Sequence, residues 1–305
     1  MGNIIAVIDL GSNSLRMSIN SLLEDGSFKL LKKVRETVRL SENMSKNGCL
    51  NEASIKRVIF TLKEFCKIIE EYNVTVVRAI TTAAVRYASN KDEFLSRVKE
   101  ETGIEFRVIS GEEEAYYSFL AVKSTLGIDN GVIMDTGGGS TEFSLIKNGE
   151  LINSISLPLG AVVLTEKTAH LSQIELYKYV SSSIGNIEWI AQCESLPVYA
   201  IGGSARTAGM IYKEKIIKAS EIDGMEISYN SFADLYQNIF NTPIENRKNI
   251  EGMDVSRADI ILAGLTPLKA FMDMTGSKNI RICLCGVKEG VFFEIKNEII
   301  TKGGI

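Results

Sequence analysis

A short motif occurs twice in this chain of 305 residues. Residues 6–14 read AVIDLGSNS, and residues 133–140 read IMDTGGGS. When Asp9 is aligned with Asp135, an offset of 126 residues (135 − 9), the glycine two positions later and the serine five positions later coincide as well. Self-similarity at a fixed offset indicates a repeated structural unit. Because each copy reads as an apolar strand, an Asp-x-Gly turn and a second apolar strand, we predict two duplicated α/β domains that face each other.

Turn and periodicity signals predict the remaining elements. Asp25-Gly26 and Asn148-Gly149 follow the two motif copies and favour tight hairpins. Apolar residues recur every three or four positions between 55 and 69, which predicts a helix with Asn51 as its N-cap. Further strands are predicted at 74–80, 104–109, 197–201 and 280–285, and further helices at 92–101, 231–240, 257–275 with a bend near Pro267, and 289–300. This alternation predicts mixed sheets covered by helices, with a domain boundary near residues 121–130.

Composition and charge argue against several classes of protein. Hydrophobic residues make up 45% of the chain and charged residues 24%, so disorder is not expected. The net charge of −4 argues against a nucleic-acid partner, but an anionic substrate can be held by backbone N–H groups and Mg²⁺. No run reaches the roughly 18 apolar residues that span a bilayer, and five irregularly spaced cysteines predict free thiols. We therefore expect a cytoplasmic protein without a membrane partner; whether it forms a homodimer is left open.

Three consecutive glycines, Gly137, Gly138 and Gly139, stand in the second motif copy. Glycine in a strand-like context costs backbone entropy, and a plain hairpin does not need three of them. They fit a turn whose N–H groups converge on a phosphate, a site to which Ser140 and Thr141 belong as well. The motif is neither a P-loop nor a dinucleotide fingerprint, because it lacks both Gly-Lys-Ser/Thr and G-x-G-x-x-G.

The first copy carries Gly11, Ser12, Asn13 and Ser14 in the corresponding turn. Gly11 lets the backbone come close to a ligand, and the other three supply N–H and side-chain donors that suit phosphoryl oxygens. A tight hairpin with polar residues is the alternative interpretation. In the second copy, two acids flank the glycines, Asp135 and Glu142, and they could hold Mg²⁺ through water.

A run of three acids, Glu112, Glu113 and Glu114, opens a predicted helix after a strand. Ser110 followed three residues later by Glu113 is a capping box, and Glu112 suits the positive end of the helix dipole. Neither explanation accounts for Glu114. A carboxylate at that place, next to a phosphate, could orient or deprotonate a water molecule.

Several further polar residues stand at predicted loops or strand ends. Arginine suits bidentate contact with phosphate, although most single arginines are solvated surface residues. Two glycines at a helix N-terminus suit phosphate as well, but they also fit a simple strand–helix turn. The candidates of these two kinds are Arg16, Arg35, Arg39 and Arg86, and Gly202, Gly203 and Ser204. His170 is the single histidine and has no second histidine or nearby cysteine, which argues against histidine-based catalysis.

Taken together, these motifs resemble those of the exopolyphosphatase / guanosine pentaphosphate phosphatase (Ppx/GppA) family, in its short two-domain class. The resemblance runs nearly end to end. It rests on IDLGSNS at residues 8–14, TAAVR at 82–86, SGEEEA at 110–115 and DTGGGSTE at 135–142. Weaker support comes from RETVRL at 35–40, GGS at 202–204 and GVKEG at 286–290.

The resemblance implies a fold and roles for particular residues. The fold is two duplicated ribonuclease-H-like domains of the actin–Hsp70–sugar kinase superfamily around a cleft, at 1–124 and 125–288, with the last helix (289–305) packing back on the first. Glu114 maps to the catalytic glutamate, residues 9–14 and 137–140 map to the phosphate loops, and Arg86 maps to a substrate contact. The metal-associated acids are Asp9, Asp135 and Glu142.

The expected activity is therefore Mg²⁺-dependent hydrolysis of the terminal phosphoanhydride of inorganic polyphosphate. Guanosine pentaphosphate is the alternative substrate within this class. We favour polyphosphate because the recognised motifs handle phosphate and none reads guanine. A small-molecule kinase and a non-catalytic polyphosphate or nucleotide sensor on the same fold are alternatives of other classes.

Overall fold

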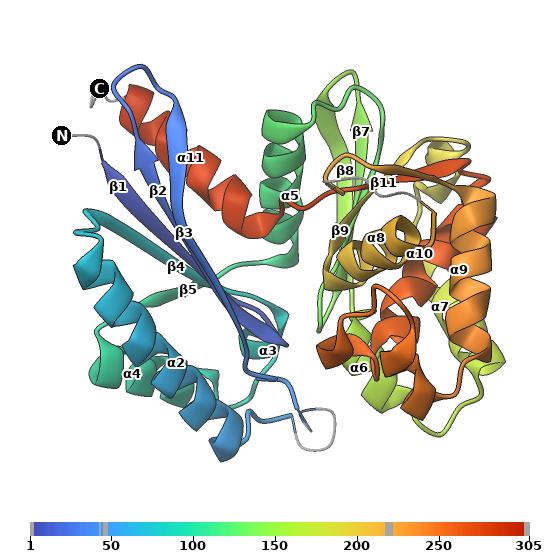
Figure 1. The fold of residues 1–305 in the computed structure, drawn as a ribbon, viewed down its shortest axis with the longest axis horizontal. Coiled ribbons are helices and arrows are strands. Elements are labelled where there is room, and N and C mark those ends of the chain that lie inside the picture. The colour runs from blue at the N-terminus through green and yellow to red at the C-terminus, as the bar shows by residue number, and fades with distance from the viewer. Residues whose placement is uncertain (1–2, 43, 45–47, 217–221, 302–305) are drawn as a thin grey trace. The chain divides into compact units, whose positions relative to one another are not determined.

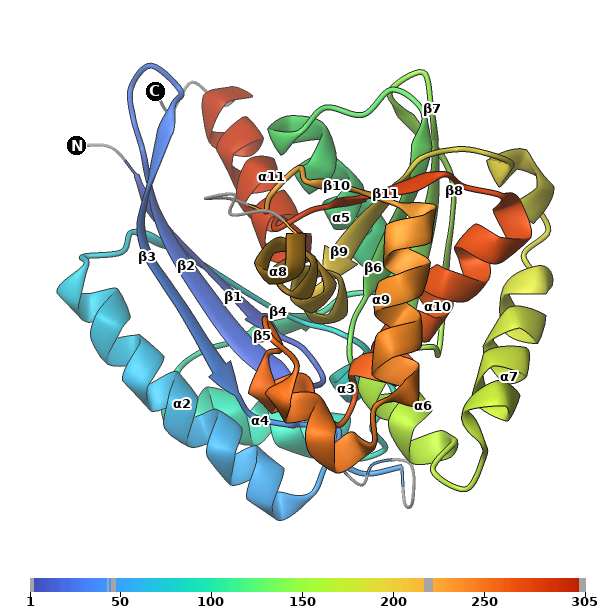
Figure 2. The ribbon, with the colours of Figure 1, turned by 45° about the vertical axis from the view of Figure 1, so that its right-hand side comes forward.

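The computed structural model of this protein describes residues 3–42, 44, 48–216 and 222–301 (Figures 1 and 2). The chain divides into two compact units. The first consists of Met1–Ala121 together with Val287–Ile305, and the second of Val122–Gly286. The sequence placed this boundary after residue 124 and the start of the returning segment at 289.

The first unit is built on a five-stranded sheet with the order β3-β2-β1-β4-β5. Strands β1, β2 and β3 form an antiparallel meander, and β4 and β5 run parallel to β1. The strands are β1 (Ile4–Leu10), β2 (Ser14–Leu22), β3 (Phe28–Thr37), β4 (Val76–Thr81) and β5 (Phe106–Val108). The helices are α2 (Glu52–Glu71), α3 (Ala83–Arg86), α4 (Lys91–Thr102), α5 (Gly111–Thr125) and α11 (Val287–Thr301).

The alternation of side chains along β1 assigns each face of this sheet to different helices. Ala6 and Ile8 belong to the core formed with α2 and α4, whereas Ile5 and Val7 belong to the core formed with α5 and α11. Figures 1 and 2 show the two helix pairs on opposite faces. Asp9 has the parity of Ile5 and Val7 and therefore lies on the α5/α11 face.

The second unit repeats this topology. Its sheet has the order β10-β11-β9-β6-β7-β8, so the run from β8 to β11 reproduces the order of the first sheet, and β10 is added at the edge. The strands are β6 (Gly131–Thr136), β7 (Thr141–Lys147), β8 (Glu150–Leu157), β9 (Val198–Gly202), β10 (Glu226–Ser228) and β11 (Asn279–Ile282). The α-helices are α6 (Ala161–Lys167), α7 (Gln173–Gly185), α8 (Gly203–Ile216), α9 (Tyr229–Asn241) and α10 (Ile261–Thr275). Asp9 and Asp135 thus occupy equivalent places at the ends of β1 and β6.

Three sequence-based element boundaries are corrected by the structure. The helix predicted from residue 257 begins at Ile261, because the Asp254 side chain caps a separate 3₁₀ turn over Val255–Arg257. The strand predicted to residue 285 ends at Ile282, since the N–H of Leu284 donates to a carboxylate of Asp223. The Asp25-Gly26 turn is part of a five-residue connection, 23–27, whereas Asn148-Gly149 is a two-residue turn with both residues at positive φ.

Two other expectations concern the whole chain. The five cysteines are free thiols, as predicted. Among the described residues, no helix combines the length and the apolar character needed to cross a membrane.

Candidate active site

The turn between β1 and β2 presents hydrogen-bond donors that the rest of the described structure leaves unused. The N–H of Gly11 donates to the Ser14 carbonyl over 3.0 Å and closes the turn. The N–H groups of Ser12 and Asn13 have no partner among the described residues, and the buried side-chain amide nitrogen of Asn13 has none either. Buried donors are nearly always satisfied in folded proteins, so this turn is suited to an anionic ligand.

The carbonyl groups of the same turn are held from behind by the segment that follows β3. The Asn13 carbonyl accepts the N–H groups of Val38 and Arg39, both over 3.0 Å. The Ser12 carbonyl accepts the N–H of Ser41 over 3.0 Å and its hydroxyl over 3.3 Å. With its carbonyls directed toward this segment, the turn offers its N–H groups to a ligand.

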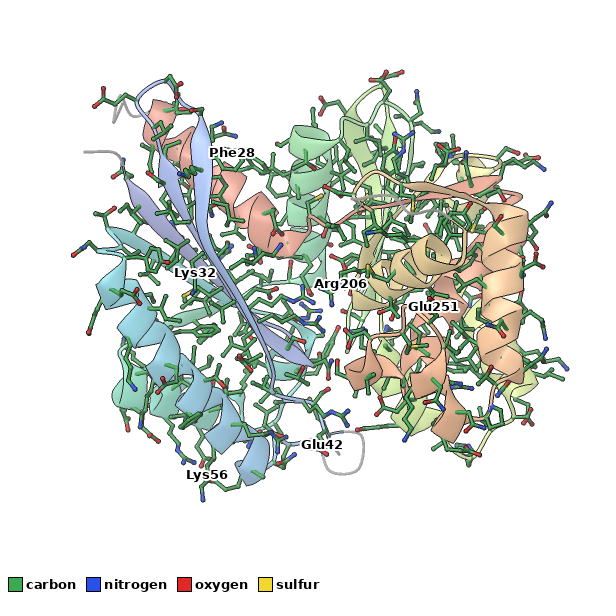
Figure 3. The ribbon with its side chains drawn as sticks, viewed as in Figure 1. Phe28, Lys32, Glu42, Lys56, Arg206 and Glu251 are labelled. Atoms are coloured by element: carbon green, nitrogen blue, oxygen red, sulfur yellow. The ribbon has the colours of Figure 1, made fainter. Side chains whose placement is uncertain are left out.

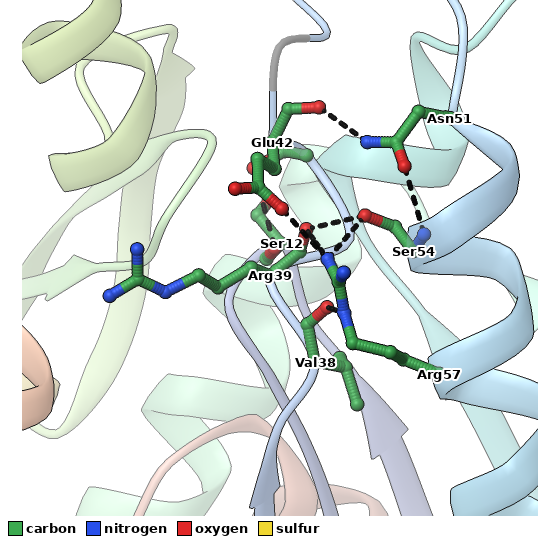
Figure 4. A network of polar contacts seen from close by, with 8 residues as sticks. Ser12, Val38, Arg39, Glu42, Asn51, Ser54 and Arg57 are labelled. Atoms are coloured by element: carbon green, nitrogen blue, oxygen red, sulfur yellow. Dashed lines mark hydrogen bonds and ion pairs between the residues drawn. The ribbon is translucent and has the colours of Figure 1, made fainter.

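The supporting segment is itself anchored to the start of α2 (Figure 4). Arg57 donates to the Val38 carbonyl over 3.0 Å and pairs with Glu42 over 2.8 Å, while the Ser54 hydroxyl donates to the Arg39 carbonyl over 3.0 Å. Arg39 has a positive φ of 45°, an unfavourable conformation for a residue with a side chain. Figure 4 shows the Arg39 side chain extending away from this network.

The turn between β6 and β7 has the same construction. The N–H of Gly137 donates to the Ser140 carbonyl over 3.0 Å, and the N–H groups of Gly138 and Gly139 have no partner in the described part of the chain. Here the turn is supported by the start of α6, whose N–H groups donate to the carbonyls of residues 137 and 138. A Cβ at Gly160 would lie 2.4 Å from the backbone of Gly138, so only glycine allows this close approach.

One hydroxyl next to the second turn has a partner within the fold. The Thr141 hydroxyl donates to the Leu159 carbonyl over 2.9 Å, which ties β7 to the segment before α6. The structure therefore gives Thr141 a supporting contact, in addition to the phosphate role predicted from the sequence.

Glu114 and Arg86 form a nearly buried ion pair in the first unit. Glu114 lies in the first turn of α5, and its Oε2 is 2.6 Å from Nη1 of Arg86, which also donates to the Ile109 carbonyl over 2.7 Å. Burial lowers the pKa of the Arg86 guanidinium, but Glu114 outweighs this and the pKa is raised. Nη2 of Arg86 is buried and has no hydrogen-bond partner. The pair thus holds the carboxylate in place and keeps one guanidinium donor available.

The capping box predicted at the start of α5 is confirmed. The Ser110 hydroxyl accepts the N–H of Glu113 over 3.1 Å, and Glu113 accepts the N–H of Ser110 over 2.8 Å. Glu113 also pairs with Arg107. These contacts give Glu113 a structural role at the start of the helix. Glu114 takes no part in the capping box.

The parallel strands bring these residues to one edge of the first sheet. β1, β4 and β5 run in the same direction, so their carboxyl ends share an edge. The 11–14 turn follows β1, Arg86 follows β4 and Glu114 follows β5. The last residues of β1 and β4, Leu10 and Thr81, pair directly with each other at this edge. Ligands of open α/β sheets bind at such an edge.

Asp9 lies beside this edge with its side chain buried. Its Oδ2 is 3.8 Å from Nη1 of Arg16, the residue directly opposite it on β2. Burial raises the pKa of the Asp9 carboxyl; Arg16 and Lys288 oppose this, and Glu289 adds to it. The sequence does not predict Lys288 and Glu289 as site residues. Their ion pair and its burial arise only when the chain folds.

Asp135 and Glu142 are directly opposite each other on β6 and β7. Glu142 is buried, and its Oε1 accepts a hydrogen bond from the Ser156 hydroxyl over 2.7 Å. Mg²⁺ is usually held by one or two carboxylates together with substrate phosphates, so this pair fits the ion. Within the described ranges, no group of three or more metal-ligating side chains occurs.

The glycines after β9 are explained by a residue that the sequence analysis missed. Gly203 and Ser204 open α8, and a Cβ at Gly203 would lie 2.2 Å from the guanidinium of Arg257. Arg257 is buried, and its Nη2 is 3.4 Å from the Ser204 hydroxyl. A Cβ at Gly202, which has a φ of 103°, would lie 2.4 Å from the Thr136 carbonyl oxygen. These residues therefore place a buried cation near the end of β9.

Known proteins resemble this chain along most of its length. The model of the Ppx/GppA phosphatase family matches residues 21–298. The bifunctional 3-dehydroquinate synthase/phosphatase of Fusobacterium nucleatum is 32% identical over 290 residues, which are 89% of this chain and 43% of that protein. The chain thus spans less than half of that relative. Exopolyphosphatase 1 of Mycobacterium tuberculosis is 27% identical over 297 residues, with 94% of this chain and 86% of that protein covered.

Solved structures also resemble this chain. The PPX-GPPA enzyme of Aquifex aeolicus has a TM-score of 0.80 at 28% identity, and the match covers 96% of this chain and 99% of that one. An exopolyphosphatase from Cytophaga hutchinsonii has a TM-score of 0.91 at 23% identity over 97% and 98% of the two chains, which shows the fold. The predicted fold class of two duplicated ribonuclease-H-like domains is confirmed. The chain belongs to the Ppx/GppA phosphatase family.

Proposed function

We propose that this protein is an exopolyphosphatase, which hydrolyses the terminal phosphoanhydride of inorganic polyphosphate. The observation that carries the proposal is the duplicated turn, in which consecutive N–H groups lack a partner in the described structure. The Arg86–Glu114 pair lies at the same sheet edge as the first copy of this turn. Relatives named exopolyphosphatases support the choice of substrate. Glu114 is the residue that orients and deprotonates the attacking water.

The ion pair suits this task because phosphoryl transfer depends on positioning more than on a strong base. Its transition state is loose in most analyses, and charge builds up on the equatorial oxygens. Arg86 fixes Oε2 of Glu114 with Nη1 and can reach a phosphate oxygen with Nη2. When a phosphate draws on the guanidinium, its hold on Glu114 weakens, and the carboxylate becomes a better acceptor for the water proton.

Mg²⁺ is proposed as the cofactor, held in the second unit by Asp135 and Glu142. The metal role of Asp9 stays a prediction from the sequence. When bound, the ion supplies positive charge that stabilises the phosphate oxygens of the transition state. The two carboxylates belong to residues that lie directly opposite each other on β6 and β7. The Ser156 hydroxyl orients Glu142 by donating to its Oε1.

The proposal is tested by phosphate release from long polyphosphate, short polyphosphate and guanosine pentaphosphate, measured in parallel with Mg²⁺. Glu114→Gln should abolish release while substrate affinity stays within a few fold. Glu113→Gln is the matched control, because it removes the charge of the neighbouring glutamate, which belongs to the capping box. It should remain active.

The outcomes separate the alternatives. Release from guanosine pentaphosphate alone would make the protein an alarmone phosphatase. Phosphate transfer that requires an acceptor would indicate a kinase. Binding without turnover, together with an unaltered Glu114→Gln protein, would indicate a sensor. Equal rates for Glu114→Gln and Glu113→Gln would remove Glu114 from the mechanism. Cytoplasmic location and the absence of a nucleic-acid partner stay predictions.

A further inference from the structure

The side chain of Tyr87 lies against the guanidinium group of Arg86. Cζ of Arg86 is 5.1 Å from the centroid of the Tyr87 ring and lies over that ring. A cation within about 6 Å of an aromatic centroid is attracted by the ring, and a planar guanidinium also stacks on aromatic faces. Burial lowers the pKa of Arg86, whereas Glu114 and, to a smaller extent, Tyr87 raise it. The ring therefore helps to hold the charge of Arg86.

The core of the first unit does not account for the place of this ring. Ala84, Val85 and Ala88 around it are buried in the core on the α2 face, whereas Tyr87 is 61% exposed. In the part of the chain that the structure describes, the ring contact of Tyr87 is the one with Arg86. Because an exposed ring gains little stability from burial, its contact with the cation is its main interaction.

The backbone fixes where both side chains start. The N–H of Arg86 donates to the Thr82 carbonyl over 3.0 Å, and the N–H of Tyr87 donates to the Ala83 carbonyl over 3.1 Å. These bonds close the single turn of α3, which follows β4. The ring and the guanidinium are therefore carried by one hydrogen-bonded turn at the edge of the sheet where the candidate site lies.

The hydrogen bonds of Arg86 leave one movement of its guanidinium unrestrained. The bonds to Glu114 and to the Ile109 carbonyl are both made by Nη1. Nη2 is buried without a hydrogen-bond partner among the described residues. Two bonds at one nitrogen fix the position of that nitrogen, but the guanidinium plane can still pivot about it. A ring that lies against the plane opposes this pivot and so sets the direction of Nη2.

We propose that Tyr87 is a positioning residue, whose ring holds the guanidinium of Arg86 so that Nη2 points to a substrate phosphate. The inference rests on the proposed function, in which Nη2 of Arg86 reaches a phosphate oxygen. Tyr87 itself does not touch the substrate. Because the ring acts through the arginine, it acts equally on every substrate that places a phosphate at Arg86.

The test compares two substitutions of Tyr87 with one at an exposed ring elsewhere in the first unit. Tyr87→Ala removes the ring, and Tyr87→Phe keeps it. Phe60→Ala is the matched control, because Phe60 on α2 is 68% exposed and has no cation over its ring in the described structure. Phe60 stands four residues after Lys56, which Figure 3 labels. The experiment measures kcat and KM of the full chain on long polyphosphate, tripolyphosphate and guanosine pentaphosphate with Mg²⁺.

Tyr87→Ala should lower kcat/KM about twofold to fivefold, as for the loss of an exposed cation–π contact. The fall should be the same on every substrate that the wild type hydrolyses. It should appear as a raised KM, since a protein that is only less stable loses kcat through a smaller active fraction. Tyr87→Phe and Phe60→Ala should match the wild type. Once Arg86→Gln is present, Tyr87→Ala should have no further effect, because the cation that the ring holds is gone.

The outcomes distinguish this inference from the proposed function. A wild type that releases no phosphate from any of the three substrates would overturn the function and with it the inference. An active wild type with an unchanged KM in Tyr87→Ala would overturn the inference alone. A loss confined to guanosine pentaphosphate would also overturn it, because the ring would then stack on the base. The same loss with and without Arg86→Gln would contradict it as well, since the ring would act elsewhere.

Discussion

Two atoms of Arg86 are assigned different tasks. Nη1 is saturated by the Ile109 carbonyl and by Glu114, and Nη2 is buried without a partner. A buried guanidinium donor without a partner is costly unless a ligand completes it. Arg86 therefore serves the fold through one nitrogen and, in the proposed mechanism, the substrate through the other.

Replacing Arg86 by Gln should cost both stability and activity. The variant removes the Arg86 cation from a nearly buried ion pair, and breaking such a pair from one side typically costs about 3 kcal/mol. We expect a lower midpoint in urea denaturation and a lower kcat/KM with a raised KM. Arg107→Gln is the control, since it breaks the half-exposed pair with Glu113. Equal effects of the two substitutions would contradict the special role of Arg86.

At the scale of single elements, the start of α5 shows how the fold positions the carboxylate that we propose as catalytic. The capping box fixes where the helix begins, and the helix then places Glu114 one residue beyond Glu113. The turns at 11–14 and 137–140 are likewise fixed by neighbouring segments, one by the 38–42 segment and the other by the start of α6. Each of the two turns is therefore positioned by backbone hydrogen bonds from a neighbouring segment.

The capping box should make part of the stability depend on pH. Partial burial raises the pKa of Glu113, but the Ser110 N–H and Arg107 outweigh it, so the pKa lies below its ordinary 4.5. A lowered pKa in the folded state gives stability that is complete above 4.5 and is lost as the pH falls below it. Glu113→Gln should therefore lower the free energy of unfolding by about 0.5 to 1 kcal/mol at neutral pH. This value is in the lower part of the range for a helix cap, because the Glu113 side chain is more than one-third exposed.

Urea denaturation of wild type and Glu113→Gln at neutral pH and near pH 3 checks this expectation. The difference between the two proteins should shrink in acid. A difference that is the same at both values would show that the charge of Glu113 has no part in it.

At the scale of the whole molecule, the first unit is made of two segments far apart in the chain. α11 supplies Val291, Phe292 and Ile295 to the core on one face of its sheet. A Cβ at Gly290 would lie 2.0 Å from the Tyr117 carbonyl oxygen, so the helix crosses α5 at backbone distance. Without α11, this face of the sheet would expose Ile5 and Val7 to water.

The two units should therefore differ as separate fragments. Residues 122–286 are continuous and contain their own core, so we expect this fragment to unfold cooperatively. Residues 1–121 should stay partly folded and bind a hydrophobic dye, and a peptide of residues 287–305 should restore cooperative unfolding. Circular dichroism during thermal denaturation measures both. A cooperative transition in 1–121 without the peptide would contradict the role of α11.

Features encoded in local sequence could be predicted, and features set by long-range contacts could not. The repeated Asp-x-Gly turn, the Asn51 cap and the Ser110–Glu113 box each depend on a few neighbouring residues, and the structure contains all three. The pairing of Lys33 with Glu289 depends on the register of β3 and on the packing of α11. No local pattern encodes such a contact. For the same reason, the burial of Arg257 against Gly203 was missed.

The return of α11 to the first unit has a consequence for synthesis on the ribosome. Residues 1–121 emerge first, yet the helix that completes their core is translated only after residues 122–286. At usual elongation rates of roughly 5–20 residues per second, one apolar face of the first sheet stays only partly covered for a time on the order of ten seconds. The second unit, although it is translated later, is complete earlier. During that interval, the nascent chain offers chaperones a binding surface that the finished protein no longer has.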